Sequence, residues 1–321
     1  MAGYRTVIIG PGGVGGFFGA RLHSAGVDVK FLARGEHYAA IKKSGLTVLS
    51  GGGSIHVPGD RFFDAPADIG PADIILFTVK SYDTEAAARS LTPMLHRGTI
   101  LISLQNGIDN EEVIANTIPE GTVFGGVAYV YATITQAATI TEWGGPKKIV
   151  FGARTRDNEL RNRGLELHRL FTASGVDAEY TDDIPAVLWS KFIFISAVGG
   201  ITALTRLTLG EILAVPESKA LLRAAMEEAL AVATAAGVPI PGGYVEDAFI
   251  KLARYDNSSR SSLYNDLANG RRLELDALSG TVVRVGAIHG VSTPIHTLIY
   301  AALLPYHRAA LKRRTEGTTG R

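Results

Sequence analysis

The sequence contains no cysteine among its 321 residues. Disulfide bonds, cysteine-ligated metals and thiol catalysis are therefore excluded. Charge of one sign is not in excess either, because 32 Lys and Arg residues face 31 Asp and Glu residues, for a formal net charge of +1. This balance gives no reason to expect nucleic acid or an anionic membrane as a partner. The eight histidines form no metal-ligand spacing, so we assign no metal site.

Long hydrophobic runs are also scarce. None approaches the length of about 20 residues that a membrane span needs, and the longest lies around residues 192–201. The N-terminus enters a strand-like segment almost at once, which is unlike a signal peptide. We therefore expect a cytoplasmic protein without a membrane partner.

The most informative segment that is present is a glycine-rich turn near the N-terminus. A strand-like run, Tyr4–Ile9, leads into Gly10-Pro11-Gly12-Gly13-Val14-Gly15, and a helical pattern follows from Phe17 to Ala25. This matches G-x-G-x-x-G between a strand and a helix, where the three glycines serve a tight turn, a close approach to pyrophosphate and helix–strand packing. We predict that the turn, Gly13 and Val14 included, binds a dinucleotide at the helix N-terminus. The alternative is a glycine-rich turn that binds nothing.

The end of the second strand-like run indicates which dinucleotide. An NAD-binding protein usually has an Asp or Glu about 20 residues after the glycines, to bind the ribose 2′-hydroxyl. Here the run from Asp28 ends at Arg34, with no acid at its carboxyl end. A guanidinium suits a 2′-phosphate, so we predict that the cofactor is NADP(H).

Strand-like runs and helical patterns alternate through the first half of the chain. The strand-like runs lie at residues 6–9, 29–32, 74–79, 99–103 and 123–127, and helical patterns at 35–44 and 84–95 separate some of them. This alternation predicts a parallel sheet covered by helices on both faces. Glycines 51–53 suggest a hairpin inserted in that sheet between residues 46 and 63.

The second half is strongly helical. After a β-rich stretch, a helix at 158–174 and a strand at 177–180, the sequence turns rich in Ala and Leu to its end. We therefore predict an α/β protein with an N-terminal Rossmann-type dinucleotide-binding domain, residues 1–181, and a C-terminal all-helical domain, residues 182–321.

Lys191 is the first candidate for chemistry, because it lies among some of the most apolar residues of the chain. A desolvated lysine has a lowered pKa suited to general acid–base work. The alternative is a side chain that reaches past its apolar neighbours to the surface.

Glu274 and Ser262 are polar candidates in the helical half. On one straight helix, 12 residues would separate them by about 18 Å and place them on different faces. Asn269-Gly270 is a plausible helix stop between them, which would let the chain fold back. Without a ligand, Glu274 is simply a first-turn helix acid.

Asn106 and Lys80 follow strands predicted to belong to the parallel sheet. Open α/β sheets bind ligands at the carboxyl ends of their strands. The alternatives are a turn asparagine before Gly107 and a surface lysine.

Together these motifs resemble the ketopantoate reductase family, also called 2-dehydropantoate 2-reductases. They occur in the family's order across nearly the whole chain: the glycine turn, Arg34, Val79-Lys80, Gln105-Asn106-Gly107, Leu188-Trp189-Ser190-Lys191, Ser261-Ser262-Leu263 and Glu274. No single motif is decisive, but the ordered set is specific.

The resemblance implies hydride transfer from NADPH to the ketone carbon of a small 2-oxo acid, most simply 2-dehydropantoate in pantothenate biosynthesis. Lys191 would be the general acid, and Glu274 would hydrogen-bond the substrate hydroxyl. Ser262 would hold the substrate carboxylate, and Asn106 would help to position Lys191 and substrate. Lys80, Arg34 and also Asn106 would contact the cofactor. Dimers are common among such relatives, so the resemblance also makes this protein a candidate homodimer.

The sequence departs from the family pattern at three positions. Ile195, Gly199 and Leu209 stand where the family often has asparagines that line the substrate site. Loss of these amides bears on substrate identity more than on reduction. Two alternatives stay open: a reductase of another branched or hydroxylated 2-oxo acid, and a non-catalytic NADPH-binding sensor.

Overall fold

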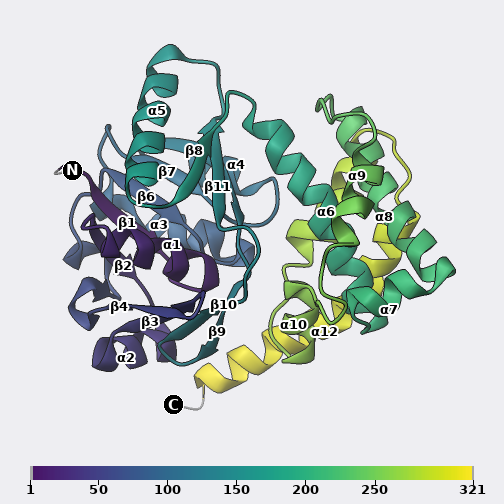
Figure 1. Ribbon diagram of the computed structural model, residues 1–321, viewed down its shortest axis with the longest axis horizontal. Coiled ribbons are helices and arrows are strands. Elements are labelled where there is room, and N and C mark those ends of the chain that lie inside the picture. The colour runs from purple at the N-terminus through teal and green to yellow at the C-terminus, as the bar shows by residue number, and fades with distance from the viewer. Residues whose placement is uncertain (1–2, 320–321) are drawn as a thin grey trace. The chain divides into compact units, whose positions relative to one another are not determined.

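The computed structural model describes the backbone of residues 3–319 and side chains through residue 313 (Figure 1). Its contacts divide the chain into two compact units. The first comprises Met1–Gln105 and Asp109–Val187, and the second comprises Asn106–Ile108 and Leu188–Arg321. The division at residue 187 falls inside a helix, whereas the predicted domain boundary after residue 181 stays a prediction.

An eight-stranded sheet forms the centre of the first unit. Its strand order is β12-β11-β8-β7-β6-β1-β2-β5, and every neighbouring pair is parallel except β8 with β11. The bounds are β1 Arg5–Ile9, β2 Asp28–Leu32, β5 Phe62–Phe63, β6 Ile74–Phe77, β7 Ile100–Ser103, β8 Thr122–Tyr129, β11 Lys148–Ala153 and β12 Asp177–Tyr180. The predicted Rossmann-type class is confirmed.

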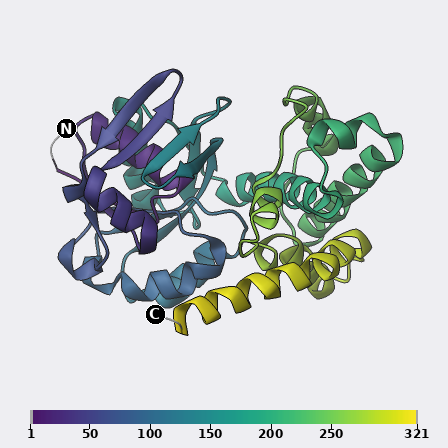
Figure 2. The same cartoon turned by 90° about the horizontal axis from the view of Figure 1, so that it is seen from below.

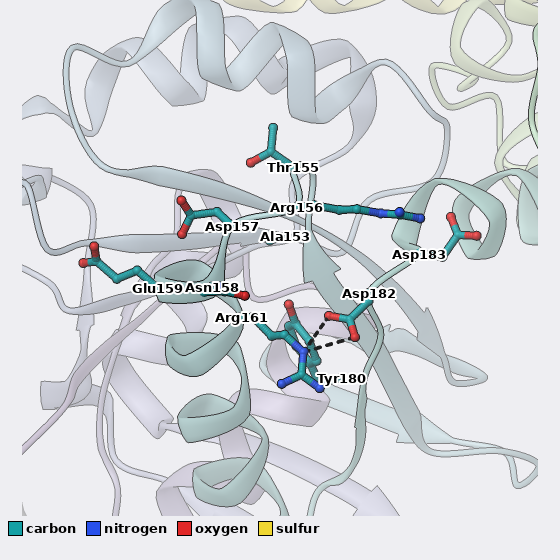
Figure 3. Close-up of a pocket in the computed structure, with 10 residues that line it drawn as sticks. All are labelled: Ala153, Thr155, Arg156, Asp157, Asn158, Glu159, Arg161, Tyr180, Asp182 and Asp183. Carbon is teal, nitrogen blue, oxygen red and sulfur yellow. Dashed lines mark hydrogen bonds and ion pairs between the residues drawn. The ribbon is translucent and has the colours of Figure 1, made fainter.

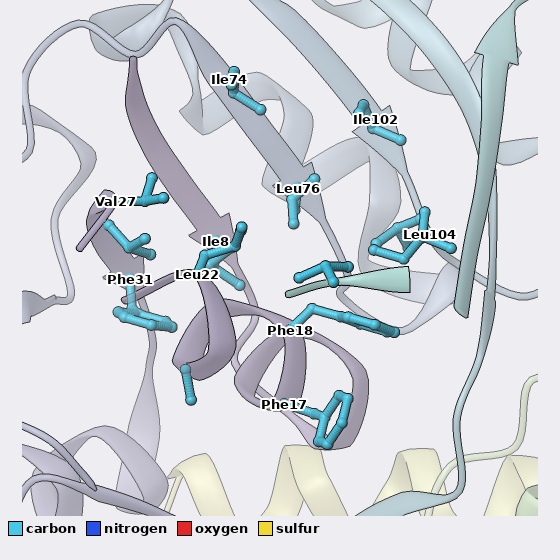
Figure 4. Packing of buried hydrophobic residues seen from close by; sticks show 14 of the residues in the cluster. Ile8, Phe17, Phe18, Leu22, Val27, Phe31, Ile74, Leu76, Ile102 and Leu104 are labelled. Atoms are coloured by element: carbon cyan, nitrogen blue, oxygen red, sulfur yellow. The ribbon is translucent and has the colours of Figure 1, made fainter. Parts of the chain in front are cut away.

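Helices cover both faces of this sheet because its strands are apolar on both sides. In β1, Ile8 packs toward α1 (Gly13–Ser24) and α5 (Asn158–Ala173), whereas Val7 and Ile9 face α3 (Thr84–Ser90) and α4 (Asn110–Thr117). Figure 4 shows Phe18 and Leu22 of α1 against the first of these faces, with Phe17 on the side of α1 away from the strands. Further elements of this unit are α2 (Gly35–Ser44) and the 3₁₀ turns η1 Gly59–Arg61, η2 Pro66–Asp68, η3 Ser81–Asp83 and η4 Thr92–Met94.

The predicted hairpin exists, but its place in the main sheet was wrong. Strands β3 (Leu46–Ser50) and β4 (Gly53–Val57) join β9 (Ala132–Gln136) and β10 (Thr139–Glu142) in a separate sheet of order β4-β3-β10-β9 (Figure 2). The reason is burial, because Val48 and Ile140 are both fully buried and this sheet contacts α1.

The second unit is helical. It contains most of α6 (Ile184–Thr205), then α7 (Leu209–Ala214), α8 (Pro216–Ala235), α9 (Tyr244–Leu252), α10 (Ser262–Ala268), the π turn η5 (Asp276–Gly280), α11 (Thr281–Ile288) and α12 (Pro294–Thr319). The expectation that no apolar run approaches a membrane span was wrong, because α6 is long and apolar enough to cross one. Its Phe192, Ile193 and Ala197 instead lie in the core of this unit.

Candidate functional site

The glycine-rich turn between β1 and α1 has the geometry of a phosphate cradle. Gly10 has a φ of +81°, and a Cβ there would lie 2.8 Å from Val79 Cγ1. A Cβ on Gly15 would clash with the Thr78 hydroxyl, which donates 2.8 Å hydrogen bonds to the carbonyls of Ile9 and Gly10. At Gly12, by contrast, the nearest protein atom to a Cβ is 3.9 Å away. Protein packing thus requires glycine at 10 and 15, and open space surrounds Gly12.

The first turn of α1 offers its backbone N–H groups to a ligand. Gly12 is the N-cap, so no side chain caps the helix, and the first turn carries no acidic residue. The positive end of the helix dipole is therefore not neutralised by a carboxylate of that turn. These features fit the pyrophosphate of a dinucleotide at Gly12, Gly13, Val14 and Gly15.

Arg34 and Lys80 follow strands that flank β1. The order β6-β1-β2 is parallel, so the glycine turn, Arg34 and Lys80 all lie at the carboxyl edge of the sheet. His37, in the first turn of α2, contacts the Pro11 carbonyl at 3.2 Å and so holds the start of α2 beside the glycine turn. The Arg34 guanidinium forms an ion pair with Asp83.

Asn106 belongs to the helical unit together with Gly107 and Ile108. The chain before it is fixed by Gln105, whose buried amide donates to the Val79 carbonyl at 3.0 Å and to Thr84 Oγ1 at 2.8 Å. Asn106 itself is partly buried. The segment that carries its amide is therefore anchored by side-chain hydrogen bonds.

Lys191 lies in the second turn of α6 and is partly buried. Desolvation lowers the pKa of its ammonium to about 8, and the Glu274 carboxylate opposes that shift. Lys191 is thus electrostatically coupled to Glu274, and both belong to the helical unit. A lysine with a pKa near the working pH gives up and regains a proton readily.

Glu274 reaches its place through a chain reversal at the predicted stop. Helix α10 ends at Ala268, Gly270 adopts a φ of +61°, and the Gly270 and Arg271 N–H groups donate to the carbonyls of Leu267 and Asp266 at 3.0 and 2.8 Å. These two bonds form a Schellman motif.

Beyond this reversal, Glu274 is 5% exposed between buried Leu273 and Leu275. It precedes the π turn η5 rather than lying in the first turn of a helix, which corrects the interpretation of it as a first-turn acid. π turns are frequent at functional sites.

Ser262 and its neighbour Ser261 have different surroundings. Ser262 is the first residue of α10, and its side chain is exposed. Ser261 caps α10 by accepting a 2.9 Å hydrogen bond from the Tyr264 N–H, and its hydroxyl also bonds to Thr202 of α6 at 2.7 Å. Ser261 therefore ties α10 to the helix that carries Lys191, a role that the sequence analysis missed although a serine at an N-cap is its local signal.

The surroundings of Ile195, Gly199 and Leu209 are apolar. Ile195 and Gly199 lie four and eight residues after Lys191 on α6, so they share roughly one helix face with it. A Cβ on Gly199 would make ordinary contact with Leu263 at 3.7 Å and Leu278 at 3.9 Å. Leu209 is 3% exposed in the same core. None of the three residues brings a side-chain hydrogen-bonding group to the helical unit.

Glu111, in the first turn of α4, yields a stability prediction. Its side chain is buried, and desolvation raises its pKa to about 7, while the Ser103 hydroxyl and Arg154 oppose the rise. The pKa of Glu111 is higher in the folded than in the unfolded chain, so its protonated carboxyl contributes to the free energy of unfolding. That contribution is fully present below about pH 4.5 and is lost as the pH rises through 7. The full loss is about 3 kcal/mol.

We therefore expect the free energy of unfolding of Glu111→Gln, relative to that of the parent chain, to rise by up to about 3 kcal/mol from pH 5 to pH 8. Urea unfolding of both proteins at the two pH values measures this difference, in which other titrating groups cancel. A difference that does not change with pH would contradict it.

The first unit also has a hollow of about 700 Å³ at the N-terminus of α5 (Figure 3). It is lined by Ala153, Thr155, Arg156, Asp157, Asn158, Glu159, Arg161, Tyr180, Asp182 and Asp183. Arg161 and Asp182 form an ion pair of 3.1 Å at its edge. None of the residues to which the sequence assigns chemistry lines it. Within residues 3–319, no group of three or more His, Asp or Glu side chains gathers to hold a metal.

Comparisons with known proteins cover both halves of the chain. The family model described as "Ketopantoate reductase PanE/ApbA" matches residues 6–156, and its C-terminal counterpart matches residues 183–307. A 2-dehydropantoate 2-reductase of Halobacterium salinarum is 30% identical over 91% of this chain and 95% of its own length. An uncharacterized oxidoreductase of Bacillus subtilis, YkpB, is 28% identical over 94% and 98%. The crystal structure of a 2-dehydropantoate 2-reductase from Geobacter metallireducens has a TM-score of 0.86 at 32% identity, over 94% of this chain and 99% of that one.

Proposed function

Because this chain belongs to the ketopantoate reductase PanE/ApbA family of oxidoreductases, we propose that it reduces 2-dehydropantoate to pantoate with NADPH. The observation that carries this proposal is Lys191, whose pKa is lowered to about 8 by desolvation and which is coupled to the buried Glu274. A protein that only senses a dinucleotide has no use for such a pair. Perturbed lysines of this kind concentrate at catalytic sites.

Each side chain then has a task. The glycine turn and the first turn of α1 bind the pyrophosphate, and Arg34 and Lys80 bind the outer part of the cofactor. NADPH, when bound, supplies the hydride for the keto carbon of the substrate. Lys191 donates a proton to the keto oxygen and, as an ammonium, stabilises the negative charge that develops there.

The remaining polar residues orient the substrate. Glu274 accepts a hydrogen bond from the substrate hydroxyl, Ser262 holds the carboxylate, and Asn106 positions Lys191 and the substrate. The location in the cytoplasm stays a prediction, as does a homodimer, which light scattering of the purified protein would test.

A second substrate class is favoured by one observation. Ile195 and Leu209 are hydrocarbon side chains of the helical unit and Gly199 has no side chain, so none of the three offers a hydrogen-bonding group to a substrate. A site with fewer polar partners discriminates less strongly for a hydroxyl group. Another branched 2-oxo acid is therefore the alternative substrate.

The proposal is tested by following NADPH oxidation with purified protein against a panel of 2-oxo acids with and without a hydroxyl group. We expect rapid turnover of 2-dehydropantoate. Faster turnover of a branched acid that lacks the hydroxyl would favour the alternative substrate. Absence of NADPH oxidation with every acid of the panel would contradict the proposed reductase and favour a protein that only binds the cofactor.

For the cofactor, we expect Arg34→Ala to weaken NADPH binding by about tenfold or more, the size of a charged hydrogen bond, and to leave NADH binding unchanged. Fluorescence titration with each nucleotide measures both dissociation constants. Arg61→Ala is the matched control, since Arg61 is another arginine of the first unit that pairs with an aspartate, Asp28. An unchanged preference in Arg34→Ala would refute the assignment of the 2′-phosphate to Arg34.

A further inference from the structure

The partner of Arg34 is an acid that no motif singled out. Asp83 ends the 3₁₀ turn η3 after β6 and pairs with the Arg34 guanidinium. The pair joins the loops that follow β2 and β6, at the carboxyl edge of the sheet. It therefore brings a carboxylate next to the residue that we assign to the 2′-phosphate.

The side chains of Arg34 and Asp83 differ in how exposed they are and in how firmly they are held. The side chain of Arg34 is 62% exposed, whereas that of Asp83 is 16% exposed. The Asp83 backbone is held by η3, where its N–H donates to the Lys80 carbonyl at 2.8 Å, and Asp83 is also the N-cap residue of α3. The carboxylate is thus the fixed member of the pair, and the guanidinium is the member that can turn.

We propose that Asp83 sets the cofactor preference by competing with the 2′-phosphate for Arg34. This inference rests on the proposed function, in which Arg34 binds that phosphate. The ion pair with Asp83 takes up part of the guanidinium's charge and donors. A phosphate dianion that binds Arg34 must therefore share the guanidinium with the Asp83 carboxylate or displace that carboxylate from it.

The same carboxylate suits the other nucleotide. In Rossmann proteins that bind NAD, the carboxylate that accepts a hydrogen bond from the ribose 2′-hydroxyl follows β2. The ion pair with Arg34 brings the Asp83 carboxylate to that end of β2 from the loop after β6. With NADH, Arg34 stays paired to Asp83 and no anion competes. Asp83 is therefore a positioning residue that weakens NADPH binding relative to NADH binding and so lowers the preference for NADPH.

The test uses the dissociation constants of NADPH and NADH, measured by fluorescence titration without any substrate. We expect Asp83→Asn to tighten NADPH binding by about fivefold, the upper size for an exposed ion pair, and not to tighten NADH binding. Asp83→Glu restores the charge and should bind both nucleotides as the parent does. Asp28→Asn, which breaks the Arg61–Asp28 pair of 2.9 Å, is the matched control.

A double variant shows whether Asp83 acts through Arg34. In an Arg34→Ala background, Asp83→Asn should leave NADPH binding unchanged. Weaker NADPH binding in Asp83→Asn, an equal change for both nucleotides, or the same gain without Arg34 would overturn the inference. If Arg34→Ala abolishes the NADPH preference while Asp83→Asn has no effect, only this inference fails. If the parent binds no NADPH, the proposed function fails with it.

Discussion

Replacement of Lys191 by alanine is expected to lower kcat by roughly 10³-fold, because it removes both the proton donor and the positive charge opposite the developing oxyanion. NADPH binding should stay unchanged, since the residues that we assign to the pyrophosphate and the 2′-phosphate belong to the other unit. Steady-state kinetics and nucleotide titration of the same preparation measure the two effects separately.

The matched control for this variant is Lys251→Ala. Lys251 is an exposed lysine on α9 of the same helical unit. It should retain the parent kcat. Full turnover in Lys191→Ala would remove Lys191 from the catalytic role.

Glu274→Gln is expected to have the second-largest effect, a loss of about 10² in kcat/KM. The carboxylate accepts the substrate hydroxyl in our proposal, and it also raises the pKa of Lys191. Without it the pKa of Lys191 falls below about 8, so the ammonium is lost at lower pH. The alkaline limb of the kcat/KM profile should therefore move to lower pH.

Asp276→Asn serves as the control for Glu274→Gln. Asp276 lies two residues further on, is exposed, and accepts a 2.7 Å hydrogen bond from the Tyr300 hydroxyl. The alkaline limb should stay in place in this variant. An unmoved limb in Glu274→Gln, with a normal unfolding transition, would contradict the coupling between Glu274 and Lys191.

Local signals were sufficient for much of the fold. The strand at residues 177–180 and the helix at 35–44 have the bounds that the sequence predicts. The helix predicted at 84–95 instead ends at Ser90 and continues as a 3₁₀ turn that contains Pro93, because proline cannot donate to the preceding turn. The hairpin at 46–57 was misplaced because its partner, β10, is about 90 residues away, and pairing over such a distance leaves no local pattern.

The candidate site divides in the same way. Gly10, Gly15 and the stop at Gly270 are readable because a positive φ or close packing demands glycine there. The distinction between Ser261 and Ser262 depends on where α10 begins, and the pairing of Asp83 with Arg34 depends on two loops brought together by the sheet. Such contacts join residues that are far apart in the sequence, so no local sequence pattern predicts them.

The central claim is most directly tested by the pH dependence of kcat/KM for reduction of 2-dehydropantoate by NADPH. The account predicts turnover that is high at neutral pH and falls as the pH rises through about 8, where the Lys191 ammonium is lost. Absence of turnover at every pH, or a rate that stays level up to pH 10, would contradict it.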